Sequence, residues 1–196
     1  MSNLFISLIG KHYLQNRGLL EPRVRCNNVL NIVDYFKDEI GIEDIINSTL
    51  KLLDKQMYDR LRNLKIIKDY QNNLPKVYCD YHRLIQAMTI QILNSLDAME
   101  IKEYQPNETP TLYFKVNVVQ GKMEIITGDN GCGIPSSEIS KIFNAFYSKK
   151  GRNQKGTGIG LTQVSGILRK HNATYEVKSE VNKYTEIKWC IPLLPK

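Results

Sequence analysis

Cysteine is scarce in this chain, and it is not placed for a structural role. The 196 residues include four cysteines, and no two of them form a C-x-x-C pair: Cys26, Cys79, Cys132 and Cys190. This spacing argues against a zinc site and against a disulfide framework, and it suits a reducing compartment such as the cytoplasm. With 42% hydrophobic residues, the chain can instead bury the core of one domain with an appended element.

Long hydrophobic runs are missing as well. No apolar stretch approaches the roughly 20 residues that a membrane-spanning helix needs. The apolar residues at 4–9 are too few, and no small-residue cleavage site follows them. We therefore expect a soluble, cytoplasmic protein without a membrane span.

The chain has an excess of positive charge but lacks a basic run interleaved with aromatic residues. Its net charge is +7, and its lysines and arginines are spread along the sequence. The densest basic segment, residues 149–155, lies between two glycine-rich motifs. A polyphosphate is a better partner for that position than a nucleic-acid backbone, although a solvated loop has the same composition. No nucleic-acid partner is expected.

Hydrophobic spacing predicts helices first and a mixed α/β region afterwards. Residues 4–9 and 29–36 have helical periodicity, with Gly18 and Pro22 between them, and another helix is predicted at 42–57. Such a short helical hairpin must pack on the rest of the chain or on a second copy. The remaining predicted elements are strands at 64–70, 77–79, 112–119, 122–127, 174–178 and 184–191, and helices at 86–99 and 162–170. This order predicts an α/β sandwich with helices on one face.

The first motif with chemical meaning is Asp129-Asn130-Gly131-Cys132-Gly133-Ile134. Asp129 closes an apolar strand, so its carboxylate should lie at the edge of the core, where an unpaired charge is unfavourable. The exocyclic amine of adenine is a suitable donor, and guanine lacks it at that ring position. Gly131 and Gly133 permit a tight turn and the approach of a flat base. Taken alone, the motif is more typical of a hairpin turn capped by aspartate.

A second glycine-rich segment, Gly156-Thr157-Gly158-Ile159-Gly160-Leu161, precedes a predicted helix. Glycine turns at a helix N-terminus present free N–H groups and the positive end of the helix dipole to phosphate oxygens. Thr157 can add a hydroxyl donor. The segment is not a P-loop, because no Lys-Ser or Lys-Thr follows the glycines. Its spacing and the missing preceding strand also differ from a dinucleotide fingerprint.

Asn94 is the third component, on the predicted helix at 86–99. Its amide oxygen is a neutral, hard ligand that suits a Mg²⁺ ion already bridged by phosphates and water. An isolated helical asparagine more often faces solvent or bonds a neighbouring backbone group. Together with the two glycine motifs, however, it predicts an ATP-binding domain that uses Mg²⁺.

These residues occur in the order of one known family. The sequence resembles the catalytic ATP-binding domain of sensor histidine kinases, within the GHKL or Bergerat-fold superfamily, from about residue 64 onward. The matching segments are the lead-in at 74–80, the N box at 83–99, the G1 box at 129–135, the F box at 142–146 and the G2 box at 156–161. The resemblance implies a Bergerat fold, a two-layer sandwich with a mixed sheet, for residues 58–196. Residues 1–57 would be a helical region, resembling a shortened dimerisation hairpin that could form a homodimer.

The resemblance also implies roles for individual residues. Asp129 should bond the adenine amine of ATP and Asn94 should hold Mg²⁺. Lys150 corresponds to a lysine of the nucleotide lid and should reach a phosphate, which makes Asn94 and Lys150 the candidate catalytic residues. Phe143 and Phe146 should anchor the hinge of the lid, and we also expect both rings to pack in the core. The other residues implied to line the nucleotide are Gly131, Gly133, Ile134, Gly156, Thr157, Gly158, Gly160 and Leu161.

Two features depart from the family pattern. One turn before Asn94 the superfamily has a polar residue, Glu in hydrolysing members and often Asn in kinases, whereas this chain has Ile90. A branched alkane can neither orient water nor take a proton, so efficient ATP hydrolysis is not expected. The chain also lacks the histidine followed by an acidic residue that serves as phosphoacceptor. His12 has no acidic neighbour, and His82 lies beside the N box.

Four functional hypotheses follow. The first is a histidine-kinase-like enzyme of two-component signalling that transfers the γ-phosphoryl group of Mg·ATP to a histidine of another protein. Its partner would be a phosphoacceptor or response-regulator protein. The second is an inactive nucleotide-gated module whose lid controls partner docking, which Ile90 and the missing acceptor favour. The third is an anti-sigma-type serine kinase, which shares the ATP fold but not the lead-in. The fourth is nucleic-acid binding through the basic charge.

Overall fold

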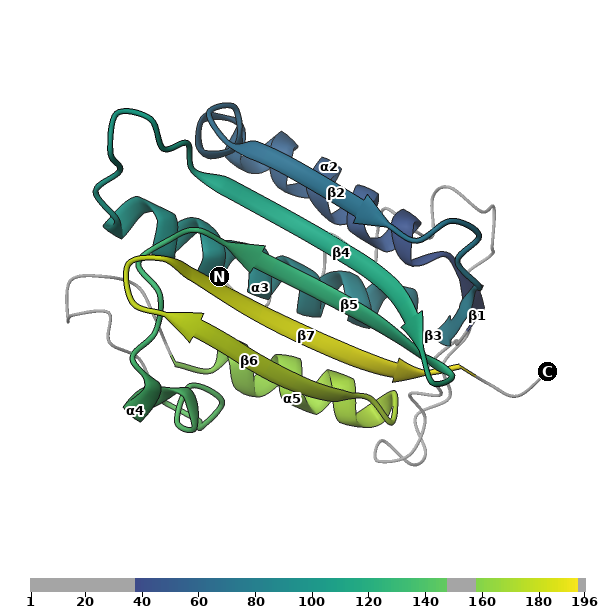
Figure 1. Cartoon of the computed structure of the whole chain (residues 1–196). Helices are drawn as coiled ribbons and strands as arrows, with labels where there is room; N and C mark the ends of the chain where they lie inside the picture. Colours follow the sequence, from purple (N-terminus) through teal and green to yellow (C-terminus); the bar gives the residue numbers. More distant parts are fainter. Residues whose placement is uncertain (1–37, 148–157, 194–196) are drawn as a thin grey trace, which may run out of the picture. The chain divides into compact units, whose positions relative to one another are not determined.

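The computed structural model describes residues 38–147 and 158–193 (Figure 1). The predicted helices at 4–9 and 29–36, with His12, lie outside the described residues. Residues 148–157 are also outside them, and this segment includes Lys150, Gly156 and Thr157. The division of the chain at residue 57 stays a prediction.

A five-stranded mixed sheet, in the order β2-β4-β5-β7-β6, forms one layer of the fold. Its strands are β2 (Lys65–Tyr70), β4 (Thr111–Val119), β5 (Lys122–Asp129), β6 (Thr174–Glu180) and β7 (Tyr184–Pro192). β2 runs parallel to β4, and every other neighbouring pair is antiparallel. Two short strands, β1 (Asp38–Ile40) and β3 (Val77–Cys79), pair separately.

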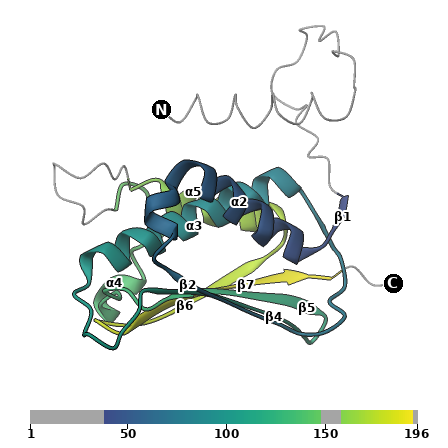
Figure 2. The ribbon, with the colours of Figure 1, turned by 90° about the horizontal axis from the view of Figure 1, so that it is seen from above.

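Three helices cover one face of the sheet and form the second layer (Figure 2). They are α2 (Ile42–Leu61), α3 (Tyr81–Ile101) and α5 (Gly160–Lys170), and a single turn, α4 (Ser136–Ile139), contacts β6. In β4, Leu112, Phe114 and Val116 are buried in alternation with more exposed residues, which is the period of a strand with one covered face. The fold is the expected two-layer α/β sandwich with helices on one face.

The central helix α3 begins at a capped turn. The side chain of Asp80 accepts a hydrogen bond from the backbone N–H of Arg83 at 3.0 Å, which satisfies one of the free donors of the first turn. Because of this cap, α3 begins at Tyr81, earlier than the predicted start at residue 86. Its buried residues occur on several sides, as expected for a helix packed against the sheet, α2 and α5.

A histidine joins the beginning of α3 to the end of α5. His171 Nε2 accepts from the backbone N–H of Asp80 at 3.0 Å, so its ring proton lies on Nδ1 and is donated to the carbonyl of Ile167 at 2.8 Å. The Nε2 contact therefore links the two helices, and the Nδ1 contact fixes the ring on the last turn of α5. This contact and that of Gly160 with Ile90 show that α3 and α5 run antiparallel.

Helix α2 is longer than predicted and is not regular throughout. It continues to Leu61, and Met57, its predicted last residue, has non-helical angles of φ −137° and ψ 37°. Before this kink, Ile42, Ile45, Ile46 and Leu53 are buried in the core that also includes α3 and β4. Residues on both sides of the predicted domain boundary therefore belong to one helix.

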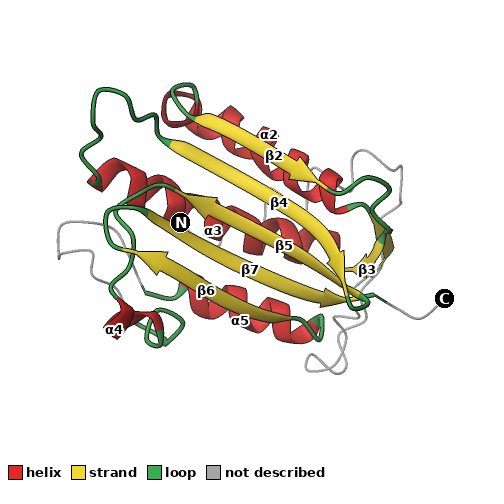
Figure 3. Cartoon of the chain, viewed as in Figure 1, coloured by secondary structure: helices red, strands yellow, loops and turns green. Residues whose placement is uncertain are grey.

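The other predicted elements are confirmed, with small shifts at their ends (Figure 3). β1 and α4, of three and four residues, were not predicted, since segments this short carry little periodicity. β3 is equally short but was predicted. No helix within the two described segments is long and apolar enough to cross a membrane.

Candidate functional site

Asp129 is the last residue of β5, and its carboxylate is buried. The residue is 2% exposed, and it pairs with Leu112 of β4 and Thr185 of β7. Burial raises the pKa of Asp129 from 3.8 to about 6, although hydrogen bonds from the Ser95 side chain and the Gly131 backbone lower it. The Gly131 N–H donates to Oδ1 at 2.9 Å. Since an ionised carboxylate offers about four acceptor positions, capacity remains for a ligand donor.

The turn after Asp129 lies directly against helix α3. A Cβ on Gly131 would be 2.7 Å from the carbonyl carbon of Ala98, closer than side chains approach in proteins. The N–H of the next residue, Cys132, donates to the Ala98 carbonyl oxygen at 3.0 Å. Only glycine at position 131 allows this close approach, which places the turn against Ala98, near the Ser95 side chain that bonds Asp129.

The other side of the turn contacts the β6–β7 connection. Gly133 has φ +68°, and a Cβ there would lie 2.2 Å from the carbonyl oxygen of Glu180. The carbonyl of Cys132 accepts from the Asn182 N–H at 2.8 Å, and the Ile134 N–H donates to Ser179 Oγ at 2.8 Å. The turn is therefore fixed between α3 and the sheet.

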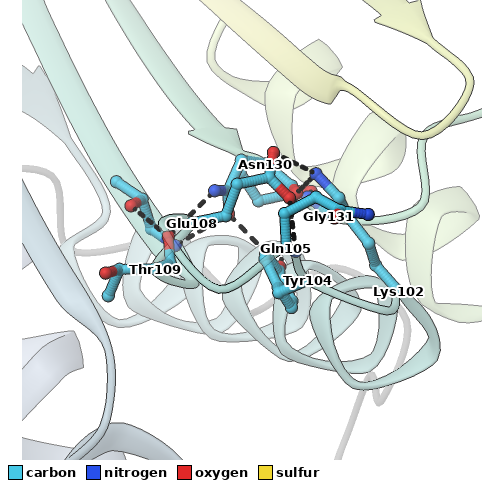
Figure 4. Close-up of polar contacts among 9 residues, drawn as sticks. Lys102, Tyr104, Gln105, Glu108, Thr109, Asn130 and Gly131 are labelled. Carbon is cyan, nitrogen blue, oxygen red and sulfur yellow. Dashed lines mark hydrogen bonds and ion pairs between the residues drawn. The ribbon is translucent and has the colours of Figure 1, made fainter.

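Asn130 anchors the same turn to the loop at residues 102–110 (Figure 4). Its side chain accepts from the Thr111 N–H at 2.8 Å and donates to the Thr109 carbonyl at 2.9 Å. Its backbone carbonyl accepts from Lys102 Nζ at 3.0 Å and from the Tyr104 hydroxyl at 3.3 Å. Asn130 thus connects the turn to the loop at residues 102–110 through both its side chain and its backbone.

Lys102, whose side chain is nearly buried, and the half-buried Tyr104 support Asn130. The Lys102 side chain is 6% exposed, pairs with Glu108 at 3.4 Å and lies 4.9 Å from the centroid of the Tyr104 ring. Burial, together with the nearby charges of Asp129 and Glu108, raises the pKa of Tyr104 to about 12. The Tyr104 hydroxyl therefore keeps its proton near neutral pH and can donate to Asn130.

Asn94 lies on α3, and the first residue of α5 contacts α3 one turn earlier. Asn94 is half-buried, and Ile90 precedes it by one turn. The space beside Gly160, the first residue of α5, is occupied by Ile90: a Cβ on Gly160 would be 3.0 Å from Ile90 Cγ2. The described end of the second glycine motif is therefore in contact with α3, one turn from Asn94.

Backbone contacts close the loop between the F box and α5. The Phe146 N–H donates to the Gly158 carbonyl at 3.0 Å, and both residues have positive φ, +65° and +66°. Phe143 is half-buried and stacks on Tyr175 with centroids 4.1 Å apart. Its carbonyl accepts from the Thr162 hydroxyl at 3.0 Å. The expectation of core packing was wrong for Phe146, which is 79% exposed and is held through its backbone.

Most of the predicted site residues are described, and several important ones were missed. Ile134 and Leu161 are half-buried beside the residues above, whereas Lys150, Gly156 and Thr157 lie outside the described segments. Sequence reasoning missed Ser95, because Asn94 was selected by one-turn spacing and successive helical residues point about 100° apart. It also missed the roles of Asn130, Lys102 and Tyr104, which depend on contacts across a loop.

Comparison with known proteins gives one family. The profile of the histidine kinase-, DNA gyrase B- and HSP90-like ATPases matches residues 79–195. The sensor protein RprX of Bacteroides fragilis (strain YCH46) is 31% identical over 67% of this chain and 25% of its own length. The adaptive-response sensory kinase SasA of Gloeothece citriformis (strain PCC 7424) is 30% identical over 71% of this chain and 35% of its own length.

The solved structures agree with this result at the level of the fold. Full-length ShkA in complex with AMPPNP superimposes with a TM-score of 0.69 and 18% identity, over 84% of this chain and 32% of ShkA. The chain therefore spans about a third or less of these three relatives. The family profile covers more than half of the chain, and its match includes both glycine motifs and all of α3. The chain belongs to the family of histidine kinase-, DNA gyrase B- and HSP90-like ATPases.

Proposed function

We propose that this chain binds Mg·ATP and transfers the γ-phosphoryl group to a histidine on a partner protein, as part of two-component signalling. The buried carboxylate of Asp129 is the single observation that supports the proposal most strongly. It is an acceptor at the edge of the core, held by Ser95 and Gly131, beside a turn in which Gly131 and Gly133 have no room for a Cβ. The similarity of the chain to the adaptive-response sensory kinase SasA supports a kinase activity.

The residues fit an adenine at Asp129. A buried carboxylate with a raised pKa is stabilised in its ionised form by another donor, and the adenine amine supplies one. Gly131, without a Cβ, leaves the carboxylate accessible to a flat ring. In ShkA the bound nucleotide analogue is AMPPNP, and we propose that ATP occupies the corresponding region of this chain.

Asn94 fits a metal that is held mostly by phosphate. The side-chain amide oxygen is one neutral ligand, which suits a Mg²⁺ ion whose other ligands are phosphate oxygens and water. When bound, Mg²⁺ would neutralise the charge of the phosphates. Lys150, Gly156 and Thr157 are proposed as the further phosphate contacts, from the segment outside the described residues.

Transfer in this arrangement depends on positioning and charge rather than on a nucleophile of this domain. A neutral imidazole nitrogen of the partner would use its lone pair to form the N–P bond. The bond between the γ-phosphorus and the bridging oxygen would break, ADP would leave, and the other imidazole nitrogen would release its proton to water. The role of this chain is to hold the nucleotide still while the partner approaches.

The substitution Asp129→Asn tests the proposal. We expect it to abolish ATP binding measured by isothermal titration calorimetry, since the amide exchanges one acceptor oxygen for a donor. Glu186→Gln is the matched control, because Glu186 accepts a 2.9 Å hydrogen bond from Tyr113 on the opposite, uncovered face of the sheet. Normal ATP binding by Asp129→Asn would refute the adenine assignment.

Ile90 favours a second candidate, a nucleotide-gated module that transfers nothing. Its side chain fills the space against Gly160 where a polar residue would be needed to orient water. Incubation with Mg²⁺ and ATP labelled at the γ-phosphate should release little labelled phosphate. Acid-labile label on an added histidine-containing acceptor would support the kinase. ATP binding with no label on any acceptor, but with nucleotide-dependent retention of a partner, would support the module.

A further inference from the structure

Arg60 connects the last turn of α2 to the C-terminal half of α3. Its Nη2 donates to Asp97 Oδ1 at 2.8 Å, and its Nε donates to Glu100 Oε1. The Arg60 and Asp97 side chains are 26% and 29% exposed, so this fork is partly shielded from water. Burial lowers the pKa of Arg60, but the hydrogen bonds to Asp97 and Glu100 outweigh it and the pKa is raised.

The kink of α2 lies three residues before Arg60. The helix departs from regular angles at Met57, and Arg60 follows within the short turn that remains. Arg60 Nη1 lies 3.9 Å from the Met57 sulfur, so the kinked residue packs under the guanidinium. Leu61, next to Arg60, is buried and fixes the end of this turn in the core.

On α3, one residue bonded to Arg60 lies between two residues that contact the turn at 129–134. Asp97 is bonded to Arg60, while the next residue, Ala98, accepts the Cys132 N–H and lies flat against Gly131. Ser95, two residues before Asp97, bonds the carboxylate of Asp129. One short segment of α3 thus has Arg60 on one side and the turn on the other.

We propose that Arg60 is a positioning residue for the turn at residues 129–134, acting through α3. The contact between Gly131 and Ala98 has no free space, so a small shift of α3 would displace both the Ser95 donor and the turn that Asp129 begins. A binding site of this kind loses its geometry when its groups move by more than about 0.5 Å. The nucleotide readout of this inference rests on the proposed function, but its structural readout does not.

The test compares Arg60→Met with Lys68→Met. Lys68 Nζ donates to Asn47 Oδ1 at 2.6 Å and so ties α2 to β2 instead of α3. Arg60→Met should weaken ATP binding roughly fivefold, whereas Lys68→Met should leave it within about twofold. Arg60→Lys, which keeps the charge but not the planar fork, should fall between wild type and Arg60→Met.

Hydrogen exchange of the Cys132 amide provides the second readout. This N–H is bonded to Ala98, so it should exchange faster in Arg60→Met and at the wild-type rate in Lys68→Met. An unchanged Cys132 amide in Arg60→Met, or equal weakening of ATP binding by both variants, would overturn the inference. If the wild type bound no nucleotide, the proposed function would fail, while the exchange experiment would still decide the role of Arg60.

Discussion

At the scale of single residues, the ionised carboxylate of Asp129 is proposed to bind ATP but lowers the stability of the fold. The pKa of Asp129 is about 6 in the folded chain and 3.8 ordinarily. Between pH 3.8 and about 6, Asp129 is therefore mostly protonated in the folded chain and mostly ionised in the unfolded chain. Ionisation of the buried carboxylate therefore destabilises the fold without ligand, by on the order of 3 kcal/mol above the folded pKa. The same ionised form is the one that the proposed contact with the adenine amine requires.

These two effects should give opposite pH dependences. As the pH falls from about 6 toward 4, the Asp129 contribution to the free energy of unfolding should increase, because protonation removes a buried charge. Over the same range, ATP binding should weaken. Denaturant unfolding and calorimetric titration at pH 7 and pH 5 measure both quantities. Asp129→Asn should remove the pH-dependent difference in stability, and parallel curves for this variant and the wild type would contradict the assignment.

Residue types in the motif could be predicted, but their supporting partners could not. Asp129, Gly131 and Gly133 were found because a buried carboxylate and two positions without room for a Cβ have recognisable residue types. Ser95 and Asn130 have no such signature, since serine and asparagine satisfy turns and helix surfaces in many ways. Their roles arise from helix orientation and from the path of the loop at 102–110.

At the scale of elements, the turn at residues 129–134 depends on one left-handed glycine, Gly133. Gly133→Ala should lower the free energy of unfolding by at least about 2 kcal/mol, because alanine is strained at φ +68° and its Cβ would meet the Glu180 carbonyl. Chemical denaturation measures this change. The matched control is Gly166→Ala in α5, where a Cβ meets nothing within 4 Å and helix propensity predicts a gain of about 0.5–1 kcal/mol. Equal effects of the two substitutions would disprove the role of the turn geometry.

Long elements were predictable, and their irregular parts were not. Strands β4 and β7 alternate clearly between buried and more exposed residues, so period-two patterning identified them. The kink at Met57 leaves no trace in the sequence, because no proline or glycine lies inside α2. Beyond the kink, Arg60 bonds Asp97 of α3 and Leu61 is buried, and both contacts depend on residues distant in sequence.

At the scale of the whole molecule, α2 and the sheet share one hydrophobic core. Ile45 and Ile46 of α2 belong to the same cluster as Phe114 of β4 and Trp189 of β7. Sequence analysis predicted the layers, but not the order of strands, because local patterns do not record which strands become neighbours. The predicted boundary at residue 57 coincides with the end of the helix predicted at 42–57, and it stays a prediction.

A shared core predicts unfolding as one unit. Trp189 is the chain's single tryptophan and is 1% exposed, so its fluorescence reports loss of the sheet. The free energy of unfolding from Trp189 fluorescence should equal the opening free energy from hydrogen exchange of amides in the middle of α2. A markedly lower value for α2 would mean that this helix opens on its own and is not part of the cooperative core.

The position of β7 between β5 and β6 has a consequence for synthesis on the ribosome. β7 is the last strand of the described chain, yet it lies inside the sheet, where its Thr185 pairs with Asp129. Until residue 192 has left the exit tunnel, β5 has an open edge and the carboxylate of Asp129 lacks one of its walls. The proposed nucleotide site is therefore complete only after translation of this strand, and until then the edge of β5 that pairs with β7 stays open.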